Sequence, residues 1–224
     1  MSAFIITLVF FICDAAAHLY IQKYHKADGV EGRGGAVTKV LLMPSLYMSL
    51  HLAGLAFGRT LANEELVLLV AIFYTLGDML LIFRQSFCFY LGVVSFMVGH
   101  CIYIAYFAHF GFSWLALIVG LAVFGALYFI YCRKIISMGH KLTAGFLVYG
   151  LMILIFATGM AGVFSTAHIL SSATALIGVV LFGWSDSRIA YNMAGVARTS
   201  DFLVMLSYIL ANVFLALAVF SINV

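Results

Sequence analysis

Charge is what this sequence has least of. Only 8% of its 224 residues are Asp, Glu, Lys or Arg, whereas 66% are hydrophobic and the mean hydropathy is +1.18. A soluble domain carries about 25% charged residues. So few charges cannot form a surface that faces water on all sides, so most of the surface must face lipid. The composition therefore excludes an ordinary soluble domain and predicts an integral membrane protein.

Cysteine and proline are scarce as well. The four cysteines lie in apolar runs and form no C-x-x-C pair, so we expect them to be small buried hydrophobic residues and they indicate no redox compartment. The only proline, Pro44, lies in the second apolar run. The formal net charge of +3 is small and does not by itself indicate nucleic acid as a partner, so we expect none.

Long apolar runs are what the chain has instead. About 20 apolar residues are needed for one helical crossing of a bilayer. The runs predict about eight transmembrane helices, over residues 3–21, 37–57, 65–83, 87–109, 112–132, 142–159, 167–190 and 202–222. They are continuously apolar and much longer than the roughly ten-residue strands of a membrane β-barrel. We therefore predict an all-α integral membrane protein, a helix bundle forming a single polytopic domain over residues 1–224.

The basic residues are distributed unevenly between the two sets of loops. Arg59 is the one exception among 11 Lys and Arg residues, because the others lie in or beside the odd-numbered loops. These are Lys23, Lys26, Arg33, Lys39, Arg84, Arg133, Lys134, Lys141, Arg188 and Arg198. Basic loops face the cytoplasm. Both termini are thus predicted on the opposite side, in a bacterial plasma or inner membrane or in the endoplasmic reticulum of a eukaryote.

Three carboxylates lie inside the predicted spans: Asp14, Asp78 and Asp186. Each costs about 2.5–3.5 kcal/mol to insert, so it should face a cavity, a partner or a functional site. At about 1.5 Å per residue, Asp78 lies about 7 Å and Asp186 about 6 Å from the expected cytoplasmic ends of their helices. This matched depth favours a shared function, although interhelical hydrogen bonding is the alternative.

The depths of other polar residues in the predicted spans can be counted in the same way from the expected cytoplasmic side. Lys39 begins the second span at a similar level, and Tyr149 and Tyr208 lie about 12 Å from the same side. His100 lies near mid-membrane, with Tyr103 almost one turn further along.

Read in order, these polar residues resemble the YhhN family, the lysoplasmalogenases. The resemblance is carried by Thr38-Lys39, Gly77-Asp78, Gly99-His100 with Tyr103, Tyr149-Gly150, Ser185-Asp186-Ser187 and Tyr208, and it covers nearly the whole chain. The family typically has a glutamine one turn after the last tyrosine. Here Asn212 stands in its place, with a shorter side chain for contacting a head group.

The resemblance implies hydrolysis of the vinyl ether of a lysoplasmalogen, a lysophospholipid in the membrane, without a cofactor. This reaction protonates a vinyl carbon and forms an oxocarbenium ion that water captures. Asp78 and Asp186 would be the catalytic pair, one as acid and the other as stabilising base, much as two carboxylates act in glycoside hydrolysis. Substrate-binding residues would be Lys39, which would hold the phosphate, and His100, Tyr103, Tyr149, Ser185, Tyr208 and Asn212.

Two other functions remain open. A metal-dependent membrane lipid hydrolase would need about three convergent ligands, but the histidines lie at different depths, so we expect no metal. A small proton-coupled transporter or lipid carrier is the alternative from another class. The Asp-bearing third and seventh spans are four spans apart, which suggests a 4+4 internal duplication of the kind transporters have.

Overall fold

A computed structural model describes residues 1–24, 32–83, 85–137, 139, 143–195 and 198–222. These residues form eight α-helices and no strand. The helices are α1 (Ser2–Tyr24), α2 (Arg33–Ala56), α3 (Glu64–Ile82), α4 (Ser86–Ala108), α5 (Trp114–Ile136), α6 (Thr143–Gly162), α7 (Ile169–Met193) and α8 (Asp201–Ile222). Each is long and apolar enough to cross a membrane. The predicted all-α membrane fold is confirmed.

Six of the eight described helices are longer than the sequence predicted; only α3 and α4 keep the predicted length. Helix α2 begins at Arg33, so Lys39 lies in its second turn and not at its start. Helix α7 continues to Met193, past the expected end at residue 190. Three basic residues of the predicted charge asymmetry fall outside the described residues: Lys26, Arg84 and Lys141. Residues 25–31, in the first connection, also fall outside them.

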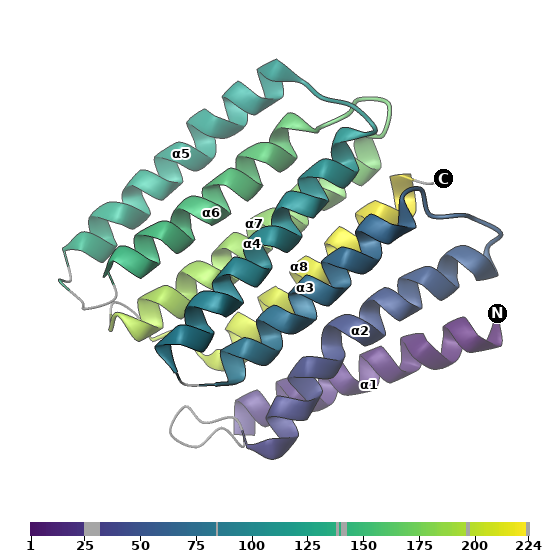
Figure 1. Ribbon diagram of the computed structural model, residues 1–224, viewed down its shortest axis with the longest axis horizontal. Coiled ribbons are helices and arrows are strands. Elements are labelled where there is room, and N and C mark those ends of the chain that lie inside the picture. The colour runs from purple at the N-terminus through teal and green to yellow at the C-terminus, as the bar shows by residue number, and fades with distance from the viewer. Residues whose placement is uncertain (25–31, 84, 138, 140–142, 196–197, 223–224) are drawn as a thin grey trace. The chain divides into compact units, whose positions relative to one another are not determined.

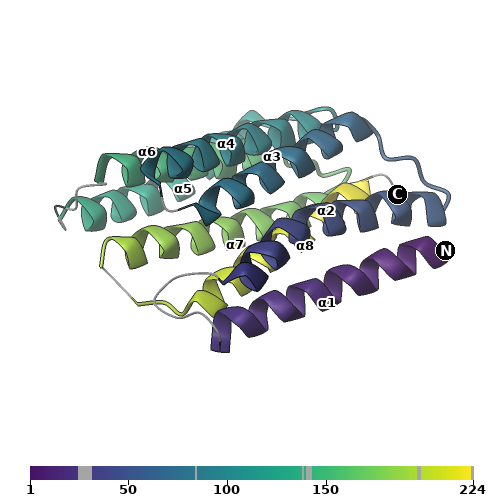
Figure 2. The same cartoon turned by 60° about the horizontal axis from the view of Figure 1, so that its bottom comes forward.

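The chain divides into two compact units, each described by itself. The first unit comprises Met1–Tyr106 with Ala216–Val224, and the second unit comprises Phe107–Leu215. In the first unit, α1 packs against α2 and α2 against α3 (Figure 1). In the second unit, α5 packs against α6 and α6 against α7, which Figure 2 shows from another direction. These contacts join helices that follow each other in the chain, as short connections require.

Glycines let the helices of the first unit approach closely. A Cβ atom added at Gly77 of α3 would lie 2.7 Å from the ring of Phe96 on α4. One added at Gly99 of α4 would lie 2.4 Å from the ring of Tyr74 on α3. Small residues at helix crossings are typical of membrane bundles, because helix association in lipid depends on close van der Waals packing. The pair of crossings fixes α3 beside α4, around Asp78.

The second unit has equivalent close approaches. At Gly150 of α6, an added Cβ would lie 2.6 Å from the ring of Tyr131 on α5. At Gly178 of α7, it would lie 2.9 Å from the backbone oxygen of Ala211 on α8. A backbone atom cannot move aside as the end of a side chain can. The α7–α8 crossing therefore tolerates little added volume.

The outer surface is apolar. Along α5, which is described throughout, Gly120, Tyr131 and Ile135 are the buried residues, and most of its large apolar side chains are exposed. Exposed apolar area on this scale is stable only against lipid or a partner. Cys13 and Cys101 are exposed too, which corrects the expectation that the cysteines are buried. They lie on apolar helix surfaces, where sequence alone does not distinguish lipid from core.

Both described ends of the chain lie at one end of the first unit. The ring of Phe57, just after α2, contacts Phe4 of α1 at 5.9 Å and Phe220 of α8 at 6.0 Å between centroids. The guanidinium of Arg59 lies over the Phe220 ring at 5.0 Å. The termini therefore lie on the same side, as an even number of spans requires. That this side is not cytoplasmic remains a prediction.

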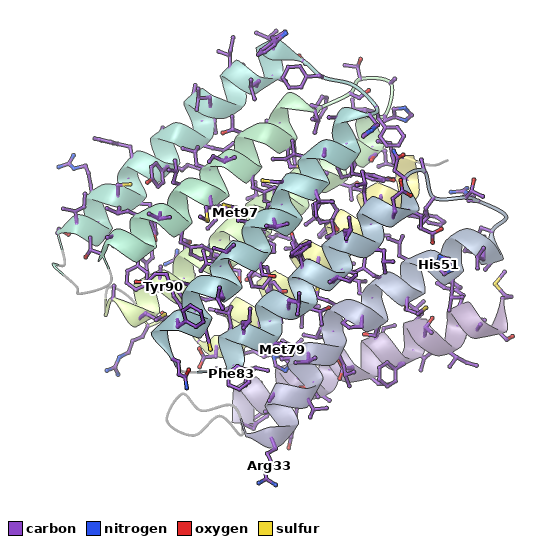
Figure 3. All side chains as sticks on the ribbon, viewed as in Figure 1. Arg33, His51, Met79, Phe83, Tyr90 and Met97 are labelled. Atoms are coloured by element: carbon purple, nitrogen blue, oxygen red, sulfur yellow. The ribbon has the colours of Figure 1, made fainter. Side chains whose placement is uncertain are left out.

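The opposite end of the first unit carries the start of α2 and the end of α3. Figure 3 shows Arg33 and Phe83 there, with His51 toward the end that holds the termini. His51 forms an exposed ion pair with Glu64 at the start of α3. The two ends of this unit thus differ in their charged groups.

Candidate functional site

The most informative side chain of the second unit is Asp186, in α7. Its side chain is buried, with 3% of its surface exposed, and its Oδ2 atom accepts a hydrogen bond from the hydroxyl of Tyr149 in α6. A carboxyl inside an apolar span is costly unless hydrogen bonds compensate it. The structure therefore brings together two residues that the sequence predicted for the site.

Helix α8 supports α7 next to this carboxyl. The hydroxyl of Ser185 donates to the backbone oxygen of Val204 at 3.0 Å. One turn before Asp186, the ring of Phe182 packs edge-on against Tyr208 at 5.5 Å between centroids. Ser185 and Tyr208, both predicted for substrate binding, thus hold α7 against α8.

Asn212 is completely buried in α8. Its Nδ2 atom donates to the backbone oxygen of Tyr208 at 2.9 Å. Its Oδ1 atom has no hydrogen-bond partner among the described residues. A buried amide oxygen without a donor is costly and is expected to have a role. Asn212 therefore keeps an acceptor for a water or a hydroxyl, despite its shorter reach.

A cavity of about 350 Å³ lies between α5, α6 and α7. Most of its lining is aliphatic or aromatic. Its polar groups are supplied by Tyr128, Tyr131, Ser187, Arg188 and Tyr191. A mostly apolar hollow with a few polar groups is typical of small-molecule sites.

The cavity borders the residues around the carboxyl. Gly150, which follows Tyr149, and Ser187, which follows Asp186, both line it. The ring of Tyr131 fits over Gly150, and its hydroxyl donates to the backbone oxygen of Phe146 at 3.0 Å. The wall between the cavity and the buried carboxyl is thus formed by α6, α7 and an aromatic ring of α5.

Arg188 gives this cavity its positive charge. The guanidinium carbon lies 5.3 Å from the ring centre of Trp184 and 5.7 Å from that of Tyr191. The Nζ atom of Lys134, from α5, lies 5.1 Å from the same Tyr191 ring. The sequence predicts Arg188 near the end of the span 167–190, at the edge of the adjoining loop, whereas α7 continues to Met193. An arginine two residues after an intramembrane aspartate was the missed signal.

In the first unit, Asp78 is the corresponding carboxyl. It is 2% exposed and lies in α3, directly after Gly77, where the ring of Phe96 packs. Counted from the observed helix ends, Asp78 lies about 6 Å inside α3 and Asp186 about 10 Å inside α7. Measured from their own helix ends, the two carboxyls therefore do not show the matched distance that the sequence predicted, because α7 is longer than expected.

A buried aromatic cluster surrounds His100 in the same unit. The hydroxyl of Tyr74 and the Nδ1 atom of His100 form a hydrogen bond of 2.6 Å. The ring of Tyr74 lies 5.9 Å from that of Tyr103, whose hydroxyl is bonded to that of Tyr47. His100 and Tyr103 thus both contact Tyr74 of α3. Tyr74 and Tyr47 were missed, because an isolated tyrosine in an apolar run resembles packing.

Lys39 and the pair on α1 have other surroundings. Lys39 is half-buried in α2. The Nδ1 atom of His18 bonds the hydroxyl of Thr38 at 2.8 Å, and its Nε2 atom bonds Gln22. Asp14 is 8% exposed, and its Oδ2 atom has no hydrogen-bond partner among the described residues. Asp14 and His18, four residues apart, thus lie on the same face of α1.

No three His, Cys, Asp or Glu side chains of the described residues converge as metal ligands would.

The sequence model of the YhhN family matches residues 35–219, which is most of the chain and agrees with the resemblance seen in its polar residues. No curated protein and no solved structure matches the sequence.

Proposed function

Because the chain belongs to the YhhN family, we propose that it is a lysoplasmalogenase. It hydrolyses the vinyl ether of a membrane lysophospholipid, releasing a fatty aldehyde and glycerophosphocholine or glycerophosphoethanolamine. The family is known for lysoplasmalogenase-like activity, and this supports the choice of bond.

The observation that carries the proposal is the buried Asp186 with the Tyr149 hydroxyl on its carboxyl oxygen. Intramembrane carboxylates are expensive and usually functional. The tyrosine holds the carboxyl in one orientation, which acid–base catalysis requires. An apolar cavity bordered by the neighbours of both residues supplies room for a lipid.

The chemistry needs one proton donor and one negative group. The donor protonates the vinyl carbon distal to the ether oxygen, and the electron pair of the double bond forms the new C–H bond. Positive charge then develops on the other carbon and the oxygen, and a carboxylate stabilises it. Water adds to that carbon and loses a proton, and the hemiacetal collapses to the aldehyde and the alcohol. One water is consumed, and the catalytic groups are regenerated.

Asp78 and Asp186 supply these two roles, either of them as the donor. Both are buried, with 2% and 3% of their surface exposed. Two carboxyl groups divide acid and base work between them when their surroundings stabilise different protonation states. The mechanism needs one carboxyl protonated and the other ionised. If both were neutral, no negative charge would stabilise the oxocarbenium ion and no base would accept the proton from water.

The test uses purified protein in detergent with a lysoplasmalogen, and free aldehyde is measured. We expect wild-type protein to release aldehyde, also in the presence of a chelator, and Asp78→Asn and Asp186→Asn to lose nearly all of the activity. Asp201→Asn, at the start of α8, is the matched control and should retain it. A transporter or lipid carrier would release no aldehyde. Near-normal turnover by either correctly folded site variant would refute the paired-carboxyl mechanism.

A further inference from the structure

The cavity of the second unit combines features that suit one kind of lipid. Its walls are apolar, contributed by α5, α6 and α7, and its volume is about 350 Å³. Pockets for small molecules span about 300–1,000 Å³, so this one is at the small end. It suits one hydrocarbon chain better than two. Arg188 supplies a cation at the lining.

Two aromatic rings hold the guanidinium of Arg188 in place. Its guanidinium stacks on Trp184 and Tyr191, and these cation–π contacts restrict its orientation. Its Nε atom is buried and has no hydrogen-bond partner among the described residues. A planar guanidinium presents a fork of donors that matches phosphate. The lining thus includes an oriented guanidinium whose Nε–H has no hydrogen-bond partner among the described residues and can donate to an anion.

Position along the helix agrees with this chemistry. Arg188 lies about 7 Å from the end of α7 at Met193, and Lys134 lies in the last turn of α5. A phospholipid that lies along the helices with its phosphate near their ends would extend its chain along the apolar lining. The two cations lie where the phosphate of such a lipid would be.

We propose that this cavity binds a single-chain phospholipid, with Arg188 as the anchor of its phosphate and the chain lying between α5, α6 and α7. The inference rests on the proposed function, since it assigns the substrate of that reaction to this cavity. It gives the phosphate contact to Arg188, whereas the sequence suggested Lys39 of the first unit for that contact. Lys134 adds a second positive charge beside Tyr191.

The natural probe is Trp184, which lines the cavity. The chain has two tryptophans, and Trp114 is 72% exposed at the start of α5. In a Trp114→Phe background, bromine atoms on a lipid chain would quench Trp184 alone. The protein is held in nanodiscs, and the half-maximal quenching concentration is measured. The two lipids are a brominated lysophosphatidylcholine and a monoacylglycerol with the same brominated chain. Neither contains a vinyl ether, so turnover does not enter the measurement.

We expect the phospholipid to quench at lower concentration than the phosphate-free lipid. Hydrogen bonds to charged groups contribute about 1.5–3 kcal/mol, so Arg188→Gln should weaken phospholipid binding about tenfold to a hundredfold. The same substitution should leave the half-maximal quenching concentration of the monoacylglycerol unchanged. Arg188→Lys keeps the charge and loses the forked set of donors, so its affinity for the phospholipid should lie between those of the parent protein and Arg188→Gln. Arg133→Gln, an exposed cation on α5 outside the cavity lining, is the matched control and should bind both lipids normally.

Three results would overturn the inference. The first is equal quenching by the two lipids in the parent protein. The second is normal phospholipid binding by both Arg188 variants. The third is displacement by inorganic phosphate at the concentrations where the lipid binds, which would make this a site for a free anion. Aldehyde release in any of these cases would leave the proposed function standing, and saturable phospholipid binding without aldehyde release would refute the function alone.

Discussion

Replacing Tyr149 with phenylalanine tests the central contact of the second unit. The substitution removes one oxygen atom and keeps the ring, which is 6% exposed in α6. The lost group is the hydroxyl that donates to the Oδ2 atom of Asp186. Since the ring still fills its place, the helices should still pack.

The magnitude follows from the kind of bond. A hydrogen bond to a charged group contributes about 1.5–3 kcal/mol net. If the hydroxyl holds the carboxyl in its reactive orientation, losing it should lower kcat/KM by about ten- to a hundredfold. A buried oxygen without its donor costs about 1–3 kcal/mol of stability. For a chain of this size, this lowers the apparent Tm by roughly 2–12 °C.

The assay is aldehyde release over a range of lysoplasmalogen concentrations, normalised to the fraction of protein that is monodisperse and helical. Tyr90→Phe is the matched control. Tyr90 lies in α4 with 45% of its surface exposed, so the loss of its hydroxyl should change neither kcat/KM nor the apparent Tm. An unchanged kcat/KM in Tyr149→Phe, with or without a lower Tm, would show that the hydroxyl only supports packing. The mechanistic reasoning would then fail.

Two further substitutions test how α7 is held. Gly178→Ala should lower the apparent Tm, because the new methyl group meets the backbone of α8 and overpacking costs about 1–3 kcal/mol. Gly125→Ala, where nothing lies within 4 Å, should not lower it, and equal midpoints in thermal unfolding would contradict the close crossing. Ser185→Ala removes the hydrogen bond to the α8 backbone and should cost about 1 kcal/mol. Circular dichroism on heating measures this loss, and a gain in stability would argue against that bond.

The fold could be predicted from sequence because its signal is strong and local. Runs such as 112–132 are apolar throughout, and one such run can only cross the membrane as a helix. Helix ends were less certain, because α2 and α7 both extend through polar residues that a hydropathy pattern assigns to loops. The predicted span 167–190 contains Arg188, but only two residues before its end, so the charge was counted with the adjoining loop. Because α7 continues to Met193, Arg188 lies deeper in the helix than the sequence predicted.

The site could be predicted only where its residues were chemically unusual. A carboxyl in an apolar span is rare enough to be noticed, so the sequence alone selects Asp78 and Asp186 as candidates. Tyrosines carry no such signal. The sequence suggested Tyr149 but offered no reason to select Tyr131, whose ring covers Gly150, the residue after Tyr149. Partners across helices depend on rotation and register, which apolar patterns in lipid specify poorly because both faces of a helix are hydrophobic.

The positions of Asp186 and Arg188 on one helix explain why a chain so poor in charge keeps both. Residues two apart on a helix do not face each other, so Arg188 is not placed to neutralise Asp186. Asp186 is instead hydrogen-bonded by Tyr149 of α6, while Arg188 stacks on aromatic rings at the cavity. If the two charges existed only to cancel each other, positions three or four apart would suit them better. Their separation agrees with the two different roles proposed above, the carboxyl in proton transfer and the guanidinium in contact with an anionic head group.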